Sequence, residues 1–175
     1  MSSIDLISIT ALVRKVQADL PEIVAKMIND SHVEFVAPKE KIRNIVTLLT
    51  ESVQMLFPES VIGIDLEDDK YEVIYMFWSH LNNFLCQVRV SLDGPEPSIE
   101  TVSDIIAGLE WHERETHEMF GINFEGNPDL SLLLLPEELE GQYPLRKIFK
   151  TDRSREDESG LSQPKPRPKE GGASE

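Results

Sequence analysis

The sequence predicts an α+β fold: a mostly antiparallel sheet covered by amphipathic helices, followed by an extended C-terminal arm and a tail. Three runs rich in β-branched and aromatic residues, VIGIDLED, YEVIYMFW and FLCQVRVSL, follow one another with short polar turns between them, as in an antiparallel meander. An amphipathic segment at residues 39–57 precedes them. It supplies a helix that can cover one face of the sheet.

The N-terminal part of the chain is predicted to form one helix and then a hairpin. Apolar residues recur at helical spacing through residues 8–19, and Pro21 ends the pattern. Two short β-rich runs, EIVAKM and HVEFVAP, flank the turn-forming Asn29, Asp30 and Ser31. This arrangement predicts two paired strands.

Segment 39–57 is predicted to form one continuous helix. Its apolar side chains recur every three or four residues and therefore share one face: Ile42, Ile45, Val46, Leu49, Val53 and Leu56. Pro58 is expected to close this helix, because the residue before a proline disfavours the α conformation.

A loop, DGPEPS, is predicted to lead from the meander into a last helix. Thr101 or Ser103 is expected to cap its first turn, and the helix is expected to continue to Met119. Gly121 follows Phe120 at the point where a left-handed residue commonly ends a helix.

The residues after Gly126 are predicted to form the arm and the tail. A turn at residues 127–129 is followed by LSLLLLPEEL, which has neither a helical nor a strand period. These leucines lie beyond the last regular element, so we expect them to be buried against another surface. Residues 151–175 have almost no apolar content and are predicted to be disordered or to wrap a partner, which leaves one domain in residues 1–150.

The charge of the chain disfavours two classes of partner. The formal net charge is −15, and the last 25 residues contribute little to it because five basic residues there face six acidic ones. An acidic domain of this kind repels nucleic acid and anionic lipid, and it favours basic protein surfaces.

Cysteine usage and hydropathy limit the chemistry further. Cys86 is the only cysteine and lies in an apolar alternation, so this chain offers no cysteine set for an iron-sulfur cluster or a zinc site. No stretch approaches the roughly 18 uninterrupted apolar residues of a spanning helix, and no secretory signal precedes the first helix. The sequence therefore predicts a cytoplasmic protein without a membrane span of its own.

The last predicted helix is crowded with ionisable residues, which raises the possibility of an independent enzyme with a metal or acid/base site built from His112, Glu115, His117 and Glu118. A zinc helix needs two histidines at i and i+4. His112 and His117 are five residues apart, which places them about 140° apart around a straight helix. The spacing argues against this site but leaves it as an alternative.

The same helix carries a charge pattern with a structural explanation. Glu110, Arg114 and Glu118 follow one another at intervals of four, which predicts a ladder of ion pairs on one face. Such a ladder is either solvated or covered by a partner protein, where an arginine becomes a positioned, bidentate donor.

Several motifs in the C-terminal part of the domain together resemble one family. They are Trp111-x-Glu113-Arg114-Glu115, Phe120-Gly121-Ile122, Phe124-x-Gly126-Asn127-Pro128-Asp129-Leu130, Leu133-Leu134-Leu135-Pro136, Glu140-Gly141 and Pro144-Leu145-Arg146-Lys147. Their order and spacing are similar to those of the C-type subunit of respiratory complex I (NADH-quinone oxidoreductase) and of the related subunit of membrane-bound nickel-iron hydrogenase complexes. The resemblance covers roughly residues 30–150.

This resemblance implies a cofactor-free structural subunit in the peripheral arm of an ion-translocating oxidoreductase, on the cytoplasmic side of the cell membrane. Its partners would be a hydrogenase-like large subunit, which it would clasp, iron-sulfur subunits and the membrane arm. Iron-sulfur clusters would reside in those partners, and nickel-iron is a further candidate cofactor there. The resemblance also implies a set of interface residues: Glu113, Arg114, Glu115, Phe120, Gly121, Pro128, Leu133, Leu134, Leu135, Pro144, Leu145, Arg146 and Lys147.

Some positions depart from the family pattern. Asn127 stands where the family usually has histidine, Ser131 and Leu132 stand where arginines are common, and Ile148 replaces an aspartate. These departures favour a ferredoxin-linked membrane-bound hydrogenase or a related complex over NADH-quinone oxidoreductase proper, which remains the alternative within the family.

Overall fold

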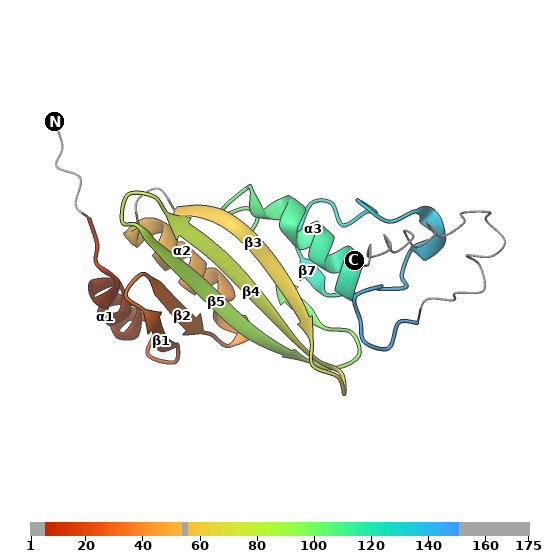
Figure 1. Ribbon diagram of the computed structural model, residues 1–175, viewed down its shortest axis with the longest axis horizontal. Helices are drawn as coiled ribbons and strands as arrows, with labels where there is room; N and C mark the ends of the chain where they lie inside the picture. Colours follow the sequence, from red (N-terminus) through yellow and green to blue (C-terminus); the bar gives the residue numbers. More distant parts are fainter. Residues whose placement is uncertain (1–5, 54–55, 151–175) are drawn as a thin grey trace, which may run out of the picture.

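The computed structural model describes residues 6–53 and 56–150 (Figure 1). Along the chain, a first helix is followed by two strands of the main sheet, a second helix by its other three strands, and a third helix comes after them. The predicted tail, residues 151–175, lies outside the described residues. Within the described residues no helix is long and apolar enough to cross a membrane.

The main sheet has five strands in the order β1-β2-β5-β4-β3. Their bounds are Val24–Asn29 for β1, His32–Val36 for β2, Leu56–Asp65 for β3, Lys70–Ser79 for β4 and Phe84–Asp93 for β5. All neighbours pair antiparallel except β2 and β5. The predicted α+β class, the hairpin and the antiparallel meander are therefore confirmed.

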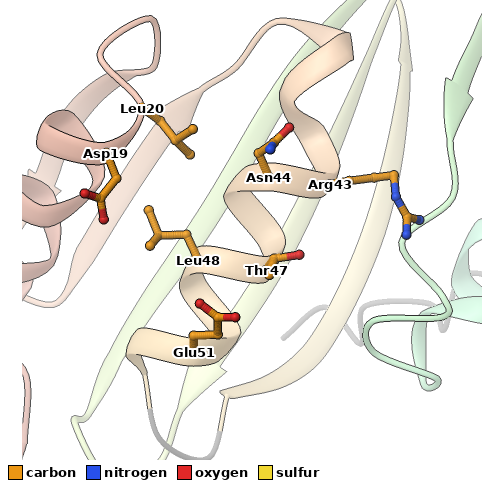
Figure 2. Close-up of a pocket in the computed structure, with 7 residues that line it drawn as sticks. All are labelled: Asp19, Leu20, Arg43, Asn44, Thr47, Leu48 and Glu51. Atoms are coloured by element: carbon orange, nitrogen blue, oxygen red, sulfur yellow. The ribbon is translucent and has the colours of Figure 1, made fainter.

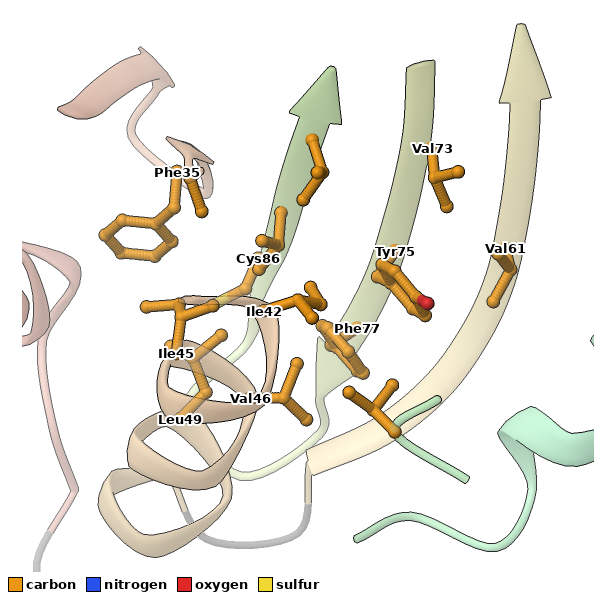
Figure 3. Close-up of a cluster of buried hydrophobic side chains, with 14 of the residues drawn as sticks. Phe35, Ile42, Ile45, Val46, Leu49, Val61, Val73, Tyr75, Phe77 and Cys86 are labelled. Carbon is orange, nitrogen blue, oxygen red and sulfur yellow. The ribbon is translucent and has the colours of Figure 1, made fainter. Parts of the chain in front are cut away.

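The hydrophobic core lies between one face of this sheet and two helices, α1 (Ile9–Asp19) and α2 (Ile42–Ser52), and it continues into residues 99–124, for example at Leu109 and Phe124. The hydroxyl of Ser8 caps α1, and Pro21 follows the helix, as the apolar spacing predicted. Figure 3 shows the predicted stripe of α2 pointing at alternate residues of the strands, among them Phe35, Tyr75 and Cys86. Alternation along the strands and the helical stripe thus meet in one layer.

The prediction of one helix over residues 39–57 is wrong at both ends. A 3-10 turn, Lys39–Lys41, precedes α2, and the helix ends at Ser52. Val53 is already extended but buried, so its apolar side chain continued the helical pattern without belonging to the helix. Pro58 lies inside β3 next to a register shift. Because β3 is an edge strand, it tolerates a proline at a position where the backbone nitrogen would not donate to a neighbouring strand.

The last helix, α3, spans Leu109–Phe120, and the start predicted for it is also wrong. Residues 103–108 form turns, and the helix begins after Gly108 without a side-chain cap. The sequence did not predict two three-residue strands, β6 (Ser98–Glu100) and β7 (Asn123–Glu125). They precede and follow α3 in the sequence and pair with each other in parallel. The predicted end is confirmed: Gly121 is left-handed, at φ 68°, and its N–H binds the carbonyl of His117.

The arm, residues 126–150, follows β7 and contains only one 3-10 turn, Glu137–Leu139. Figure 1 shows it looping beside α3 at the end of the molecule away from α1. It returns to the sheet through the backbone N–H of Lys147, which donates to Asp65 at 2.8 Å.

Candidate functional site: the last helix and the arm

Glu113 is the buried centre of the region and is fully enclosed by its own chain. Its carboxylate accepts from the amide of Val102 at 3.0 Å, from Nδ2 of Asn127 at 2.9 Å, from the hydroxyl of Tyr75 at 3.3 Å and from the hydroxyl of Thr101. One side chain thereby joins α3 to β4, to the segment after β6 and to the first turn of the arm.

Burial raises the pKa of Glu113 above its ordinary value, although its hydrogen bonds, that from Thr101 foremost, oppose the change. Burial also raises the pKa of Tyr75, and the neighbouring carboxyl adds to that effect. Because Glu113 is fully buried, its side chain is not available for contact with another protein. Any contribution of this residue to an interface would act through the segments it holds.

Arg114 fixes the next part of the arm through backbone oxygens. Its Nε donates to the carbonyl of Ser131 at 2.7 Å, and one terminal nitrogen donates to the Ser131 hydroxyl at 2.8 Å and the Leu132 carbonyl at 2.7 Å. The other terminal nitrogen pairs with Asp129 at 2.8 Å. The guanidinium carbon also lies 5.4 Å from the centre of the Trp111 ring, within the range of a cation–π contact.

The predicted ion-pair ladder along α3 is therefore not the arrangement that forms. In the described part of the chain, the ion partner of Arg114 is Asp129, which comes from the arm rather than from the helix. Burial raises the pKa of Glu118, the amides of the arm lower it, and the charge of Arg114 lowers it further. Tertiary contacts have displaced the weak pairing along the helix surface.

Glu118 fixes the leucine segment through backbone amides. Its carboxylate accepts from the N–H groups of Leu133 at 2.9 Å, Leu134 at 3.0 Å and Leu135 at 2.9 Å. Burial alone would raise its pKa, but these three amides outweigh that effect and the pKa of Glu118 is lowered. A charged acceptor thus replaces the strand partner that these amides lack.

The two contacts together decide where the leucines point. Arg114 and Glu118 hold residues 131–135 by their backbone, whereas Leu130 packs against the core. Leu134 is 62% exposed and Trp111 is 58% exposed, while Leu133 and Leu135 are half-buried. The helix and the arm therefore present a preformed surface on which Leu134 and Trp111 are exposed.

The end of the arm is held by a second arginine. Nε of Arg146 donates to the carbonyl of Phe120 at 2.6 Å, and its guanidinium lies over the rings of Tyr71 and Tyr143 at 5.0 and 4.6 Å. A Cβ at Gly121 would come within 2.6 Å of the Tyr143 ring, so glycine is required there both for its left-handed backbone and for this close approach.

The remaining residues of the implied interface set divide by exposure. Glu115, Pro128, Leu145 and Lys147 are exposed, whereas Phe120 and Pro144 are half-buried. Phe120 packs so close to Gly63 of β3 that a Cβ there would meet its ring at 2.5 Å. The exposed members lie on α3 and at three points of the arm.

The alternative metal or acid/base site is not assembled in the described residues. Nδ1 of His117 lies 2.9 Å from the carbonyl of Ile122, Glu118 faces the arm amides, and Glu115 is exposed. Across residues 6–53 and 56–150, no three or more His, Cys, Asp or Glu side chains are grouped so that they could hold a metal ion.

A shallow hollow of about 300 Å³ lies between α1 and α2 (Figure 2). Leu20 and Leu48 face each other across it, and Arg43 points away from it toward Asp104, to which it is ion-paired at 2.8 Å. Its remaining lining side chains are polar and come from two helix surfaces: Asp19, Asn44, Thr47 and Glu51. They do not form a set of converging groups around a ligand, so we do not assign this hollow a site.

The sequence did not indicate the partners Thr101, Ser131 and Asp65. Each is a short polar side chain beside a turn, where many such residues simply bind their own loop. The sequence does contain a pattern that could have predicted the burial of Glu113. One face of α3 packs against β3 and β4, and its residues recur at helical spacing: Leu109, Glu113, Thr116 and Phe120. A glutamate within that stripe indicates a buried, hydrogen-bonded carboxylate.

A family model described as "Respiratory-chain NADH dehydrogenase, 30 Kd subunit" matches residues 35–155. The chain is 33% identical to the C-type subunit of the F(420)H(2) dehydrogenase of Methanosarcina mazei over 112 residues, covering 63% of this chain and 71% of that protein. It is also 33% identical to the C-type subunit of the NADH-quinone oxidoreductase of Roseiflexus sp. over 143 residues, covering 78% of this chain and 80% of that protein.

Two solved structures share the fold. A chain of the archaeal membrane-bound sulfane sulfur reductase superposes with a TM-score of 0.76 at 22% identity, covering 89% of this chain and 93% of that one. A trypsin-resistant fragment of Nqo5 superposes with a TM-score of 0.56 at 23% identity, covering 68% of this chain and 99% of the fragment. At these identities the likeness concerns the fold alone.

Proposed function

This chain belongs to the 30 kDa subunit family of respiratory-chain NADH dehydrogenase, as its motifs predicted, and we propose that it is a cofactor-free structural subunit of a complex I-like, ion-translocating membrane-bound oxidoreductase. In this role it sits in the peripheral arm on the cytoplasmic side of the membrane and clasps the hydrogenase-like large subunit. Iron-sulfur subunits and the membrane arm complete the assembly, and the redox centres belong to those partners.

One observation carries this proposal: residues 131–135 of the arm are held by their backbone, and Leu134 among them is left exposed. Arg114 and Glu118 bind the carbonyls and amides of residues 131–135, and Leu134 is left largely exposed. A surface that is ordered before binding loses little conformational entropy when a partner covers it. Trp111 beside Arg114 adds the kind of aromatic and arginine pair that often anchors an interface.

Within the family, the proposal places this chain in a branch with a donor or acceptor other than the NADH–quinone pair, with the ferredoxin-linked, membrane-bound hydrogenase type first. The departures at Asn127 and Ser131 support this placement, because the side chains of both residues contribute to the way the arm is held. Relatives include the corresponding subunit of an F(420)H(2) dehydrogenase, so the electron donor named for such complexes is not always NADH.

The composition of the native assembly tests the proposal. The tagged chain is recovered from its own cells after mild detergent extraction, and the co-purifying proteins and metals are identified. We expect a hydrogenase-like large subunit, ferredoxin-type iron-sulfur subunits and antiporter-like membrane subunits. A lone chain that carries its own stoichiometric metal would instead support the independent enzyme.

A substitution in the arm then tests the surface itself. Leu134→Asp removes an exposed apolar contact without touching the backbone groups that hold the arm. We expect about a tenfold loss of assembled complex and no change in the thermal unfolding of the isolated chain. Met27→Asp on β1 is the matched control, because Met27 is also an exposed apolar residue but lies far from the arm. Equal complex yields for the two variants would contradict a role of the arm in assembly.

A further inference from the structure

The main sheet has a second face, opposite α1 and α2, that carries apolar side chains. Along β4, the residues Tyr71, Val73, Tyr75 and Phe77 point into the core, so the alternate residues Ile74, Met76 and Trp78 point to the other side. Ile74 is buried but does not belong to the core cluster that α1 and α2 cover. Figure 1 looks onto this face, with α2 behind the strands.

The pairing register places these side chains in one strip along β3 and β4. Phe57 lies opposite Trp78, Ser60 opposite Met76, and Ile62 opposite Ile74. Phe57 is 41% exposed and Ile62 is 39% exposed. A strand that is apolar on both faces is typical of a sheet covered on both faces, whereas an antiparallel sheet with one wet face alternates apolar and polar residues.

A polar network borders the strip along β5 and β2. Arg89 donates to Glu34 at 2.9 Å and also pairs with Glu72, while Gln87 donates to Glu34 and lies 2.9 Å from the ring nitrogen of His32. Lys26 lies opposite Glu34 in the register. Burial raises the pKa of Glu34, but the hydrogen bonds from Arg89 and Gln87 and the charges of Arg89 and Lys26 lower it below its ordinary value. The charges of this face, including Glu72 at one end of β4, therefore largely satisfy one another, and the paired residues from Phe57 to Ile62 and from Ile74 to Trp78 that form the strip lie beside them.

Neither a second copy nor the end of this chain fits the face as a cover. Two copies would bring together chains that each carry a net charge of −15, which opposes association. Residues 151–175 contain Leu161 as their only large aliphatic side chain and no aromatic one. An apolar strip with a polar border instead has the anatomy of a protein–protein interface.

We propose that the β3–β4 strip of the open sheet face, centred on Phe57, Ile62, Met76 and Trp78, is a docking surface for a different protein of the assembly. Its occupant presents an apolar surface bordered by basic side chains, which complement the acidic charge of this chain. This surface is separate from α3 and the arm. The subunit would then be held on two sides, with its sheet sandwiched between α2 and the second partner.

Thiol labelling of the intact assembly tests this surface. Cys86 is the only native cysteine; it is fully buried, and burial raises its pKa to about 12, so it contributes little background. Ile62→Cys places a thiol on the strip, and Ser60→Cys is a nearly isosteric second variant on the same strip. Each is labelled with a maleimide in the complete assembly and again in the chain released from it. A photo-crosslinking amino acid in place of Met76 identifies the neighbour.

We expect labelling at both cysteines to be about tenfold slower in the assembly than in the released chain, with crosslinks into another subunit. Equal labelling rates in the two states overturn the proposal, as do crosslinks into a second copy or into residues 151–175. Leu134→Cys, labelled in parallel, separates the two surfaces. If assembly slows labelling at position 134 but not at position 62, the open face is rejected as a docking surface and the arm proposal stands. If assembly slows labelling at neither position, both surfaces are rejected.

Discussion

The main sheet and the α3–arm region are stabilised by different interactions. In the sheet, ladders of backbone hydrogen bonds pair the strands, and apolar side chains of α1 and α2 cover one face. The arm forms no strand, and its one regular element is a 3-10 turn. Charged side chains of α3 instead bind the backbone carbonyls and amides of residues 131–135. The sheet depends on burial of apolar surface, and the part of the arm beside α3, residues 127–135, depends on three ionisable residues: Glu113, Arg114 and Glu118.

This difference shows how a charged motif can be structural. A cluster of Glu, Arg and His on one helix is the pattern of a catalytic or metal site, and it is also what an irregular segment needs when no strand satisfies its carbonyls and amides. Here the carboxylates accept from amides and hydroxyls, and the guanidinium donates to carbonyls. Substitutions of these residues should therefore change folding before they change any chemistry.

The largest effect is expected from Glu113→Ala. The change leaves a cavity and removes the acceptor from the Val102 amide, the Tyr75 hydroxyl and Asn127, all buried or half-buried. We expect a loss of about 3–5 kcal/mol in the free energy of unfolding, measured by chemical denaturation of the isolated chain. Glu115→Ala, two residues away and exposed, is the control and should stay within about 0.5 kcal/mol of wild type. Similar stabilities of the two variants would mean that the buried carboxylate does not hold the region together.

A smaller effect is expected from Glu118→Gln. The neutral amide retains one acceptor oxygen for the three leucine N–H groups but loses the charge that strengthens these bonds. We expect a loss of about 1–3 kcal/mol, together with faster hydrogen exchange at residues 133–135. Exchange rates that match wild type at these amides would exclude Glu118 as their anchor, and Glu115→Gln controls for the loss of one negative charge on α3.

The effect of pH should distinguish the two carboxylates. The folded pKa of Glu118 lies below the 4.5 of an unperturbed glutamate, so its stabilisation is complete above that value and is lost as pH falls through the lowered pKa. The stability difference between wild type and Glu118→Gln should therefore shrink on acidification. The folded pKa of Glu113 is raised above 4.5, so its contribution has the opposite sign and becomes less favourable as pH rises from 4.5 through the raised value. A constant difference between wild type and Glu118→Gln across this range would contradict the lowered pKa.

Most of the sheet region was predictable from the sequence because its periods are local. Alternation identified β4 and β5 almost to the residue, and the stripe from Ile42 to Leu49 identified α2. The overlong α2 prediction arose because Val53 is buried without being helical, so burial and periodicity coincided beyond the end of the helix. The strands β6 and β7 are three residues each, too short to show a period of their own.

The α3–arm region was predictable in its motifs but not in its contacts. The family resemblance and the helix stop at Gly121 followed from sequence, whereas the use of Thr101 as a partner of Glu113 rather than as a helix cap did not. Ion pairs at i and i+4 on a helix contribute only a few tenths of a kcal/mol, so contacts with residues far away in the sequence readily replace them. Arg114 binds Asp129 and the carbonyls of Ser131 and Leu132 instead, and only the path of the arm brings these groups together.

The smallest global effect is expected from Arg114→Lys, which sharpens the contrast between the two regions. A lysine keeps the charge that pairs with Asp129 but lacks the fork that reaches the carbonyls of Ser131 and Leu132 at the same time. The side chain is 14% exposed, so these bonds are largely shielded from water and their loss should cost about 1 kcal/mol. The sheet does not depend on them, so the cost should appear as local opening: faster proteolysis between residues 127 and 136 at nearly unchanged thermal unfolding. Arg14→Lys, an exposed position on α1, should change neither quantity. If Arg114→Lys lowered the unfolding temperature without opening the arm, the arm and the sheet would form one cooperative unit, and the distinction between the two regions would fail.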